Sequence, residues 1–482
     1  MSRQIIISLV SVIVCSCATA PPVQVPDIGV NIPETWTAKT TETGQVAVRW
    51  WEDFADADLV KTVEMALERN FDLQGAAARL EMAAAEATIS SADLQPTVNS
   101  SYTRYQRKQN FVGFPIPGAE DQVLSTVSTN HGISLDVSWE LDLWGRLRAS
   151  TQAALANLQA SAADFRGAQL SIAGQTVKTW FAIAEAQQQI DLSRETVTSF
   201  RESADRVRER FEAGIRPSLD LRLALLNLSN AEALLEQRLQ QFDSATRQLK
   251  VLLSEYADGT IEPPASLPTV APHVPSGLPA DLVARRPDLV AAERQLAAAE
   301  ARVGVARKER LPRIRLTAGG GTATDALRSL INGDFSVWSL LADVTAPLWQ
   351  GKGRFGAHIG RAEAESATAL ASYANTALIA YAEVETALAA EQFLEDREKH
   401  LVISAEQARA AETLSEERYR AGLESYITVL DSQRSAVQVE GELIAAKRLR
   451  LENRVDLYLA LGGGFEQIES PFMLENSGGF FN

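Results

Sequence analysis

The fold is decided by one stretch of sequence, Ile133-Ser134-Leu135-Asp136-Val137-Ser138-Trp139-Glu140-Leu141-Asp142-Leu143-Trp144-Gly145-Arg146. Apolar residues alternate with Ser, Asp and Glu from Ile133 to Leu141, which predicts a strand with one apolar and one polar face. No proline follows from Arg146 to Ile215, so the strand is expected to turn into a very long helix. At 1.5 Å per residue, roughly 65 helical residues make a rod about 100 Å long.

This pattern of strand, turn and helix occurs twice in the chain. Asp72-Leu73 returns as Asp288-Leu289, Leu143–Arg148 aligns with Trp349–Arg354, and Arg210–Gly214 aligns with Arg418–Gly422. The offsets are 216, 206 and 208 residues, and they change only inside loops. Because loops tolerate insertions while helices preserve spacing, we interpret the chain as two copies of one half-molecule.

The duplication gives the domain organisation. We expect a signal peptide at 1–16, a lipidated extended segment at 17–55, a first repeat at 56–260, a proline-rich linker at 261–280, a second repeat at 281–465 and a tail at 466–482. Each repeat is predicted to hold helices, two strands and a long antiparallel helical hairpin.

The strands of the two repeats are predicted with different clarity. In the first repeat we expect strands at 97–106 and 133–141, joined by a long exposed loop. In the second we expect a strand at 314–318, a turn region at Gly319–Gly321 and another strand within 335–349.

The N-terminus has the pattern of a secretory signal. Arg3 precedes an apolar run from Ile5 to Val14, and the small residues around Cys17 are typical of a cleavage site. Val14-Cys15-Ser16-Cys17 resembles a bacterial lipobox, which makes Cys17 the expected lipid-anchor residue; a plain signal peptide cut nearby is the alternative. With Cys15 removed and Cys17 acylated, no thiol remains for disulfides, metal ligation or catalysis.

Composition excludes several functions. The chain has 482 residues with 46 basic and 62 acidic side chains, a formal net charge of −16, which disfavours binding to nucleic-acid phosphates. The four histidines show no metal-ligand spacing, and the acidic residues on helices are typical of solvated faces, so we expect no metal, no cofactor and no enzyme activity.

The predicted strands cannot seal a membrane pore alone. Beyond the signal, no run reaches the roughly 18 apolar residues of a spanning helix, so a membrane crossing would have to be a closed β-barrel. One chain offers four strands, and open strand edges are not tolerated in lipid. Two, three or four copies would therefore pool eight, twelve or sixteen strands. The alternative is a soluble coiled-coil bundle with a small sheet.

Several motifs point to one family. The chain resembles the TolC-type outer membrane efflux proteins, in particular their lipidated NodT-like branch. The resemblance covers about residues 17–465 and is carried by Trp50–Phe54, Trp139–Arg146, Leu278–Asp288, Pro347–Gly351 and Arg418–Gly422 leading to Val429-Leu430-Asp431.

The resemblance implies an α+β membrane protein. Three copies would share a twelve-stranded β-barrel in the outer membrane, continuous with a long periplasmic α-helical barrel and anchored by lipid. The implied function is the exit duct of a tripartite efflux system, with a periplasmic adaptor and an inner-membrane transporter, commonly proton-driven, as partners. A passive porin-like channel without pump partners is the alternative.

The resemblance also implies a gate at the hairpin ends. Asp431 matches the second aspartate of a D-x-x-D pattern, whereas Thr428 stands at the first. Candidates for contacts that close the gate are Arg418, Tyr419, Glu424 and Ser425, with Asp220 in the first repeat. The turns at Gly214 and Gly422 would contact the adaptor.

A glycine-rich segment has two interpretations. Gly351–Gly356 matches G-x-G-x-x-G, but the helix after it is too long for a dinucleotide-binding crossover. We therefore expect Gly351 and Gly353, like Gly145, to let the chain turn from strand to helix.

Overall fold

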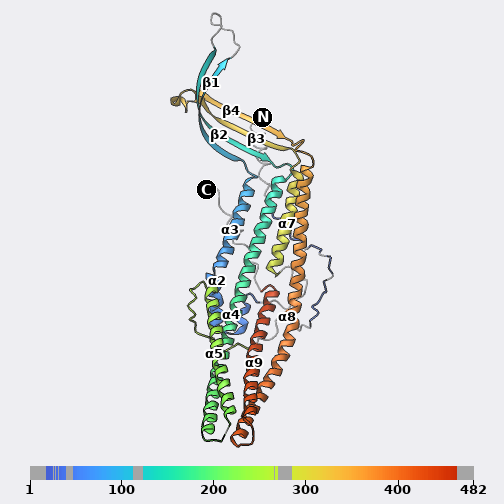
Figure 1. The fold of residues 1–482 in the computed structure, drawn as a ribbon. Coiled ribbons are helices and arrows are strands. Elements are labelled where there is room, and N and C mark those ends of the chain that lie inside the picture. Colours follow the sequence, from blue (N-terminus) through green and yellow to red (C-terminus); the bar gives the residue numbers. More distant parts are fainter. Residues whose placement is uncertain are drawn as a thin grey trace. The chain divides into compact units, whose positions relative to one another are not determined.

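The computed structural model describes residues 18–24, 26–27, 29–30, 32–38, 47–111, 123–215, 217–264, 266–269 and 285–463. Figure 1 shows the helices and strands that they form. The residues fall into two compact units. The sheet unit comprises the described parts of 1–24, 81–160 and 293–371, and the helical unit those of 25–80, 161–292 and 372–482. The expected signal peptide, Cys17 and the tail at 466–482 lie outside the described residues.

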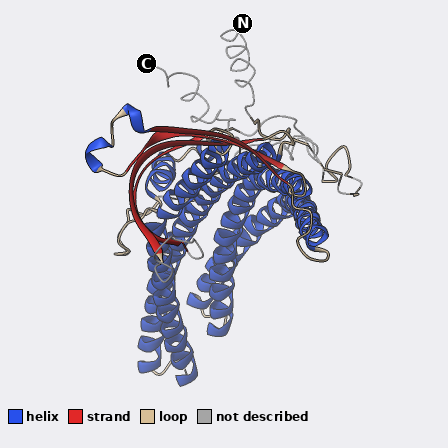
Figure 2. Ribbon diagram, turned by 90° about the horizontal axis from the view of Figure 1, so that it is seen from above, coloured by secondary structure: helices blue, strands red, loops and turns tan. Residues whose placement is uncertain are grey.

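The sheet unit holds four antiparallel strands in the order β1-β2-β3-β4. Their bounds are Thr97–Phe111 for β1, Leu124–Leu141 for β2, Arg313–Thr324 for β3 and Ser336–Thr345 for β4. The two repeats are joined where Trp139 on β2 pairs with Leu316 on β3. Figure 2 shows the strands as one curved sheet. Within the described residues, β1 and β4 each have a strand on one side only.

The predicted turn at Gly319–Gly321 was wrong, because these glycines lie inside β3. Gly321 pairs with Ser134, and a Cβ built on it would lie 1.9 Å from the carbonyl oxygen of Ile133. A Cβ on Gly319 would lie 2.7 Å from Oδ1 of Asp136. The glycines are therefore explained by the close approach of the neighbouring strand rather than by a turn.

The long loop predicted between the first two strands was also wrong in its extent. β1 continues to Phe111 and β2 already begins at Leu124. The added residues of β1 are polar except for Phe111 and lack the alternation that predicts strands, yet Arg107 pairs with Ser128 and Lys108 with Val127. Backbone pairing accepts these side chains, so the polar composition misled the sequence interpretation.

The helices follow the sequence prediction closely. They are α2 Ala57–Arg69, α3 Phe71–Ala92, α4 Arg146–Glu212, α5 Ser218–Leu252, α7 Pro287–Lys308, α8 Arg354–Arg420 and α9 Tyr426–Ala460, with short 3₁₀ helices at Trp50–Phe54, Leu327–Ser329 and Gly333–Phe335. Asn70 separates α2 from α3: its side-chain oxygen accepts from the amides of Asp72 and Leu73, 2.9 and 3.2 Å away, and so caps α3. Among the described helices, none combines the length and apolar character needed to span a membrane.

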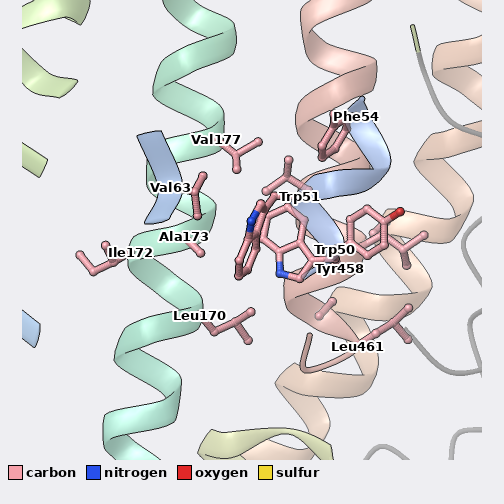
Figure 3. Close-up of a cluster of buried hydrophobic side chains, with 14 of the residues drawn as sticks. Trp50, Trp51, Phe54, Val63, Leu170, Ile172, Ala173, Val177, Tyr458 and Leu461 are labelled. Carbon is pink, nitrogen blue, oxygen red and sulfur yellow. The ribbon is translucent and has the colours of Figure 1, made fainter. Parts of the chain in front are cut away.

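The core of the helical unit contains a group of aromatic rings packed among aliphatic side chains (Figure 3). Trp50 stacks on Tyr458 of α9 with ring centroids 5.1 Å apart, and Phe54 meets Phe181 of α4 edge-on at the same distance. The Tyr458 hydroxyl donates to the Asp53 carboxylate at 2.6 Å. The Trp-Trp-Glu-Asp-Phe segment thus packs helices of both repeats together.

Candidate functional site: the ends of the helical hairpins

Both hairpins turn through the same glycine cap. Gly214 and Gly422 have φ values of +73° and +76°, a conformation that glycine adopts at little cost. In each turn the amide after the glycine donates to the carbonyl five residues earlier, at 2.9 Å. This is the Schellman arrangement that ends helices, so α4 and α8 end in the same way in both repeats.

The helices that follow the turns begin differently. Pro217 precedes α5 without a side-chain cap, whereas the Ser425 side chain accepts from the Thr428 amide of α9 at 3.4 Å. The Glu424 carboxylate accepts from the Ser425 amide at 3.2 Å and from the Thr428 hydroxyl at 3.0 Å, and lies 3.6 Å from the Arg418 guanidinium. These contacts lower the pKa of Glu424, and the hydrogen bond from the Ser425 backbone amide has the largest effect. The second turn therefore carries a carboxylate whose ionised form is stabilised.

An apolar cluster joins the two hairpin ends within the helical unit. Its buried members come from α4, α5, α8 and α9, and are Ala204, Val207, Ala224, Tyr419, Tyr426, Val429 and Leu430. The rings of Tyr419 and Tyr426 are 5.5 Å apart, and the Arg210 guanidinium lies 5.0 Å from the Tyr419 ring centroid. The cluster can hold the two hairpins together at their ends.

Tyr426 also contacts the first hairpin directly. Its hydroxyl lies 3.3 Å from the Ser203 hydroxyl of α4. Burial raises the pKa of Tyr426, and the nearby charge of Asp220 raises it further. Sequence reasoning missed Ser203, Arg210 and Tyr426. The signal available for Tyr426 was its difference from Ser218, the residue 208 positions earlier.

The candidate gate residues fall into two groups. Arg418, Tyr419, Glu424, Ser425 and Thr428 are brought together around the second turn. Asp220 is buried beside Tyr426 from the first repeat. By contrast, Asp431 is exposed, and its side chain makes no hydrogen bond or ion pair with other described residues.

The three strand-to-helix glycines lie in the sheet unit. Gly145, Gly351 and Gly353 have φ values of +72°, +91° and +81°. The Gly145 carbonyl accepts from the Lys308 ammonium at 3.0 Å, and the Asp142 carboxylate caps α4 by accepting from the Leu147 amide at 3.0 Å. These backbone conformations favour glycine where each strand passes into a long helix.

Across the described ranges, no group of three or more His, Cys, Asp or Glu side chains could hold a metal ion.

Comparison with known proteins identifies close relatives. A model of the family described as outer membrane efflux protein matches residues 62–255 and again 278–463. The outer membrane protein OprJ of Pseudomonas aeruginosa is 32% identical over 464 residues, 95% of each chain. The pyoverdine export outer membrane protein OpmQ of Pseudomonas putida is 31% identical over 492 residues, covering 98% of this chain and 99% of the relative. The solved structure of the outer-membrane channel OprN superposes with a TM-score of 0.84 at 28% identity, covering 93% of this chain and 99% of that one.

Proposed function

The chain belongs to the outer membrane efflux protein family, and on that premise we propose that it is the exit duct of a tripartite pump. It is an outer membrane efflux protein, and its family consists of channels rather than enzymes. The observation that carries the proposal is the double match of the family model, once to each repeat. The duct itself does no chemistry, so the energy for export comes from its partners.

The open sheet supports assembly from several copies. β1 and β4 are sheet edges, and such edges template pairing with another chain. The residues of β4 are all exposed, among them Trp338, Leu340 and Val344 on its apolar face. We propose that three copies pool their strands, β4 of one pairing with β1 of the next, into a twelve-stranded barrel whose apolar face meets lipid. Native mass spectrometry of detergent-extracted protein tests this, and a stable monomer contradicts it.

A lipid on Cys17 completes the membrane attachment in this proposal. The lipobox-like segment supports it. Radiolabelled palmitate should enter the parent protein and should not enter a Cys17→Ser variant. Equal incorporation into both proteins would place the acylation elsewhere.

The proposed partners are a periplasmic adaptor, which docks at the Gly214 and Gly422 turns, and an inner-membrane transporter, commonly proton-driven. Leu423 beside the second turn is 70% exposed, so a photo-crosslinking residue there should capture the adaptor in cells. The same probe at Val251, exposed near the far end of α5, is the control. Capture from both positions or from neither would contradict docking at the turns.

The hairpin ends are proposed as the gate. Asp431 is exposed and has no polar contact within the described chain, which supports a role toward neighbouring copies around the pore axis. We expect Asp431→Ala to change single-channel conductance in planar bilayers, whereas Asp205→Ala, an exposed residue paired with Arg208 on α4, should not. Conductance identical to the parent would remove Asp431 from the gate.

Export itself is tested in cells. Deleting the gene should sensitise cells to some exported compound, and the intact gene should restore resistance. Unchanged susceptibility across a broad toxin panel would favour the passive channel, as would failure to capture any adaptor.

A further inference from the structure

The segment that follows Cys17 is held by a buried ion pair. Glu293 and Arg294 on α7 are only 6% and 3% exposed and pair with each other. The Arg294 guanidinium donates to the carbonyls of Pro21 and Pro22 at 2.8 and 3.1 Å. The Glu293 carboxylate accepts from the Gln24 amide at 3.0 Å. Both charges of the pair are therefore used to bind the backbone of the N-terminal segment.

Packing of the helices does not require this pair. The duplication aligns Glu293 and Arg294 with Ala77 and Ala78, 216 residues earlier. Burying charges is costly unless they are paired and hydrogen-bonded. The segment supplies bonds that complete the pair, together with the Gln159 side chain, 3.1 Å from Arg294. The first repeat has alanines at these positions, and in the second repeat the N-terminal segment supplies hydrogen bonds to the buried Glu293 and Arg294 side chains.

A second contact of the same kind lies in the helical unit. The Glu385 carboxylate on α8 accepts from the amides of Thr37 and Ala38 at 2.7 and 3.1 Å. Trp36 is buried, with its ring 6.3 Å from that of Tyr381. Glu385 and Tyr381 align with Val177 and Ala173 in the first repeat, 208 residues earlier. At these two aligned positions the first repeat has apolar side chains, which offer no acceptor to the amides of the segment.

We propose that the N-terminal segment is held at two separate points, each within one unit: Glu293 and Arg294 bind residues 21–24, and Glu385 binds residues 37–38. We call these two bound stretches the strap. Cys17 precedes Pro21 by four residues, a reach of at most about 14 Å for extended chain. The acyl group is therefore positioned by the protein rather than carried on a free tether. This last step rests on the proposed lipid anchor, whereas the binding of the strap does not.

The first experiment replaces Glu293 and Arg294 by alanine, the residue that the first repeat has at both aligned positions. A spin label is attached at Val23→Cys, a position 74% exposed, in the full-length trimer. The parent should give an immobilised spectrum, and Glu293→Ala/Arg294→Ala should lose the immobilised component while remaining trimeric. Arg307→Ala on α7, which removes an exposed ion pair with Glu363 of α8, is the control and should leave the spectrum unchanged. An immobilised label in the double variant overturns the proposal.

The second experiment needs no substitution and so stands even if the double variant fails to fold. Hydrogen exchange of the unsubstituted protein reports on the amides of Gln24, Thr37 and Ala38, which all donate to carboxylates. We expect exchange at least about tenfold slower than in an unfolded peptide, because hydrogen bonds to charged groups must open first. Exchange of these amides at the peptide rate overturns the proposal.

The same samples separate this proposal from the proposed function. Palmitate incorporation reports on the anchor, and restored resistance of the deletion strain reports on export. A strap that is immobilised in unacylated protein supports the binding of the strap while removing the lipid anchor. A mobile strap in acylated protein that still restores resistance supports the lipid anchor and the export function, and it contradicts the binding of the strap.

Discussion

The long helices of the two repeats share their length but differ in what they bury. α4 and α8 each have 67 residues and align without a gap. Val177, Phe181 and Ile183 of α4 are fully buried. Their counterparts 208 residues later are Glu385, Ala389 and Glu391. At these positions the duplicated helices have thus kept their length, while α4 buries apolar side chains and α8 carries alanine and two glutamates.

The returning helices differ in the same sense. Phe242 and Thr246 of α5 correspond to Arg450 and Arg454 of α9. Arg454 donates to Glu391 at 2.7 Å, and Arg450 lies 3.5 Å from the same carboxylate. Phe242 instead packs against the large apolar cluster. Helix length and turn chemistry therefore fix the hairpin, and the material between its helices can be exchanged.

The largest change in the free energy of unfolding is expected from the buried apolar side chains of α4. Phe181→Ala removes a fully buried ring that contacts Phe54 and leaves a cavity. We expect a loss of about 3–5 kcal/mol in the free energy of unfolding, measured by denaturant titration. Phe71→Ala is the matched control: this ring is 69% exposed, and we expect a loss below about 1 kcal/mol. Equal losses would mean that α4 does not form the core.

The next largest change is expected from the ion pairs between α8 and α9. Glu391→Ala removes the acceptor of Arg454, which is buried, so we expect a loss of about 1.5–3 kcal/mol, the range for hydrogen bonds to charged groups. The same titration of Glu365→Ala, whose carboxylate forms an exposed pair with Arg361 on α8, should show below about 1 kcal/mol. If the two variants lose the same amount, the second hairpin is not held by its buried ion pairs.

The sequence predicted the shared features of the repeats better than their differences. Periodicity and absent prolines located the long helices, and the glycines located their turns, because these are local properties of the chain. Gly319–Gly321 were misassigned since the reason for each glycine lies on a neighbouring strand. The Ser203–Tyr426 contact and the strap bound by Arg294 join residues more than 220 positions apart, and no local pattern encodes such pairs.

The residues that end α5 and α9 can be substituted in opposite directions, and we expect opposite changes in stability. Ser254 has a φ of +55° at the end of α5, where α9 has Gly462 at +88°. Ser254→Gly should stabilise the protein by less than about 1 kcal/mol, because glycine relieves the backbone strain while the exposed Phe71 amide loses the Ser254 hydroxyl as its acceptor. Gly462→Ala should destabilise it by about 1 kcal/mol or more, since its Cβ would lie 3.0 Å from the Arg285 carbonyl. Thermal midpoints that move in the same direction would contradict this assignment.

The smallest expected effect is a difference in the pH dependence of hydrogen exchange at the two turns. The lowered pKa of Glu424 means that its bonds to Ser425 and Thr428 stabilise the second turn above the unfolded pKa of about 4.3. This stabilisation is lost as pH falls through the still lower folded pKa. Hydrogen exchange of the Ser425 and Thr428 amides, corrected for the intrinsic rate, should therefore accelerate at acid pH in the parent. In Glu424→Gln, which keeps an acceptor without the charge, it should not. The first turn, whose helix begins after Pro217 without a side-chain cap, is the internal reference. Equal acid sensitivity of both turns would show that the carboxylate does not distinguish them.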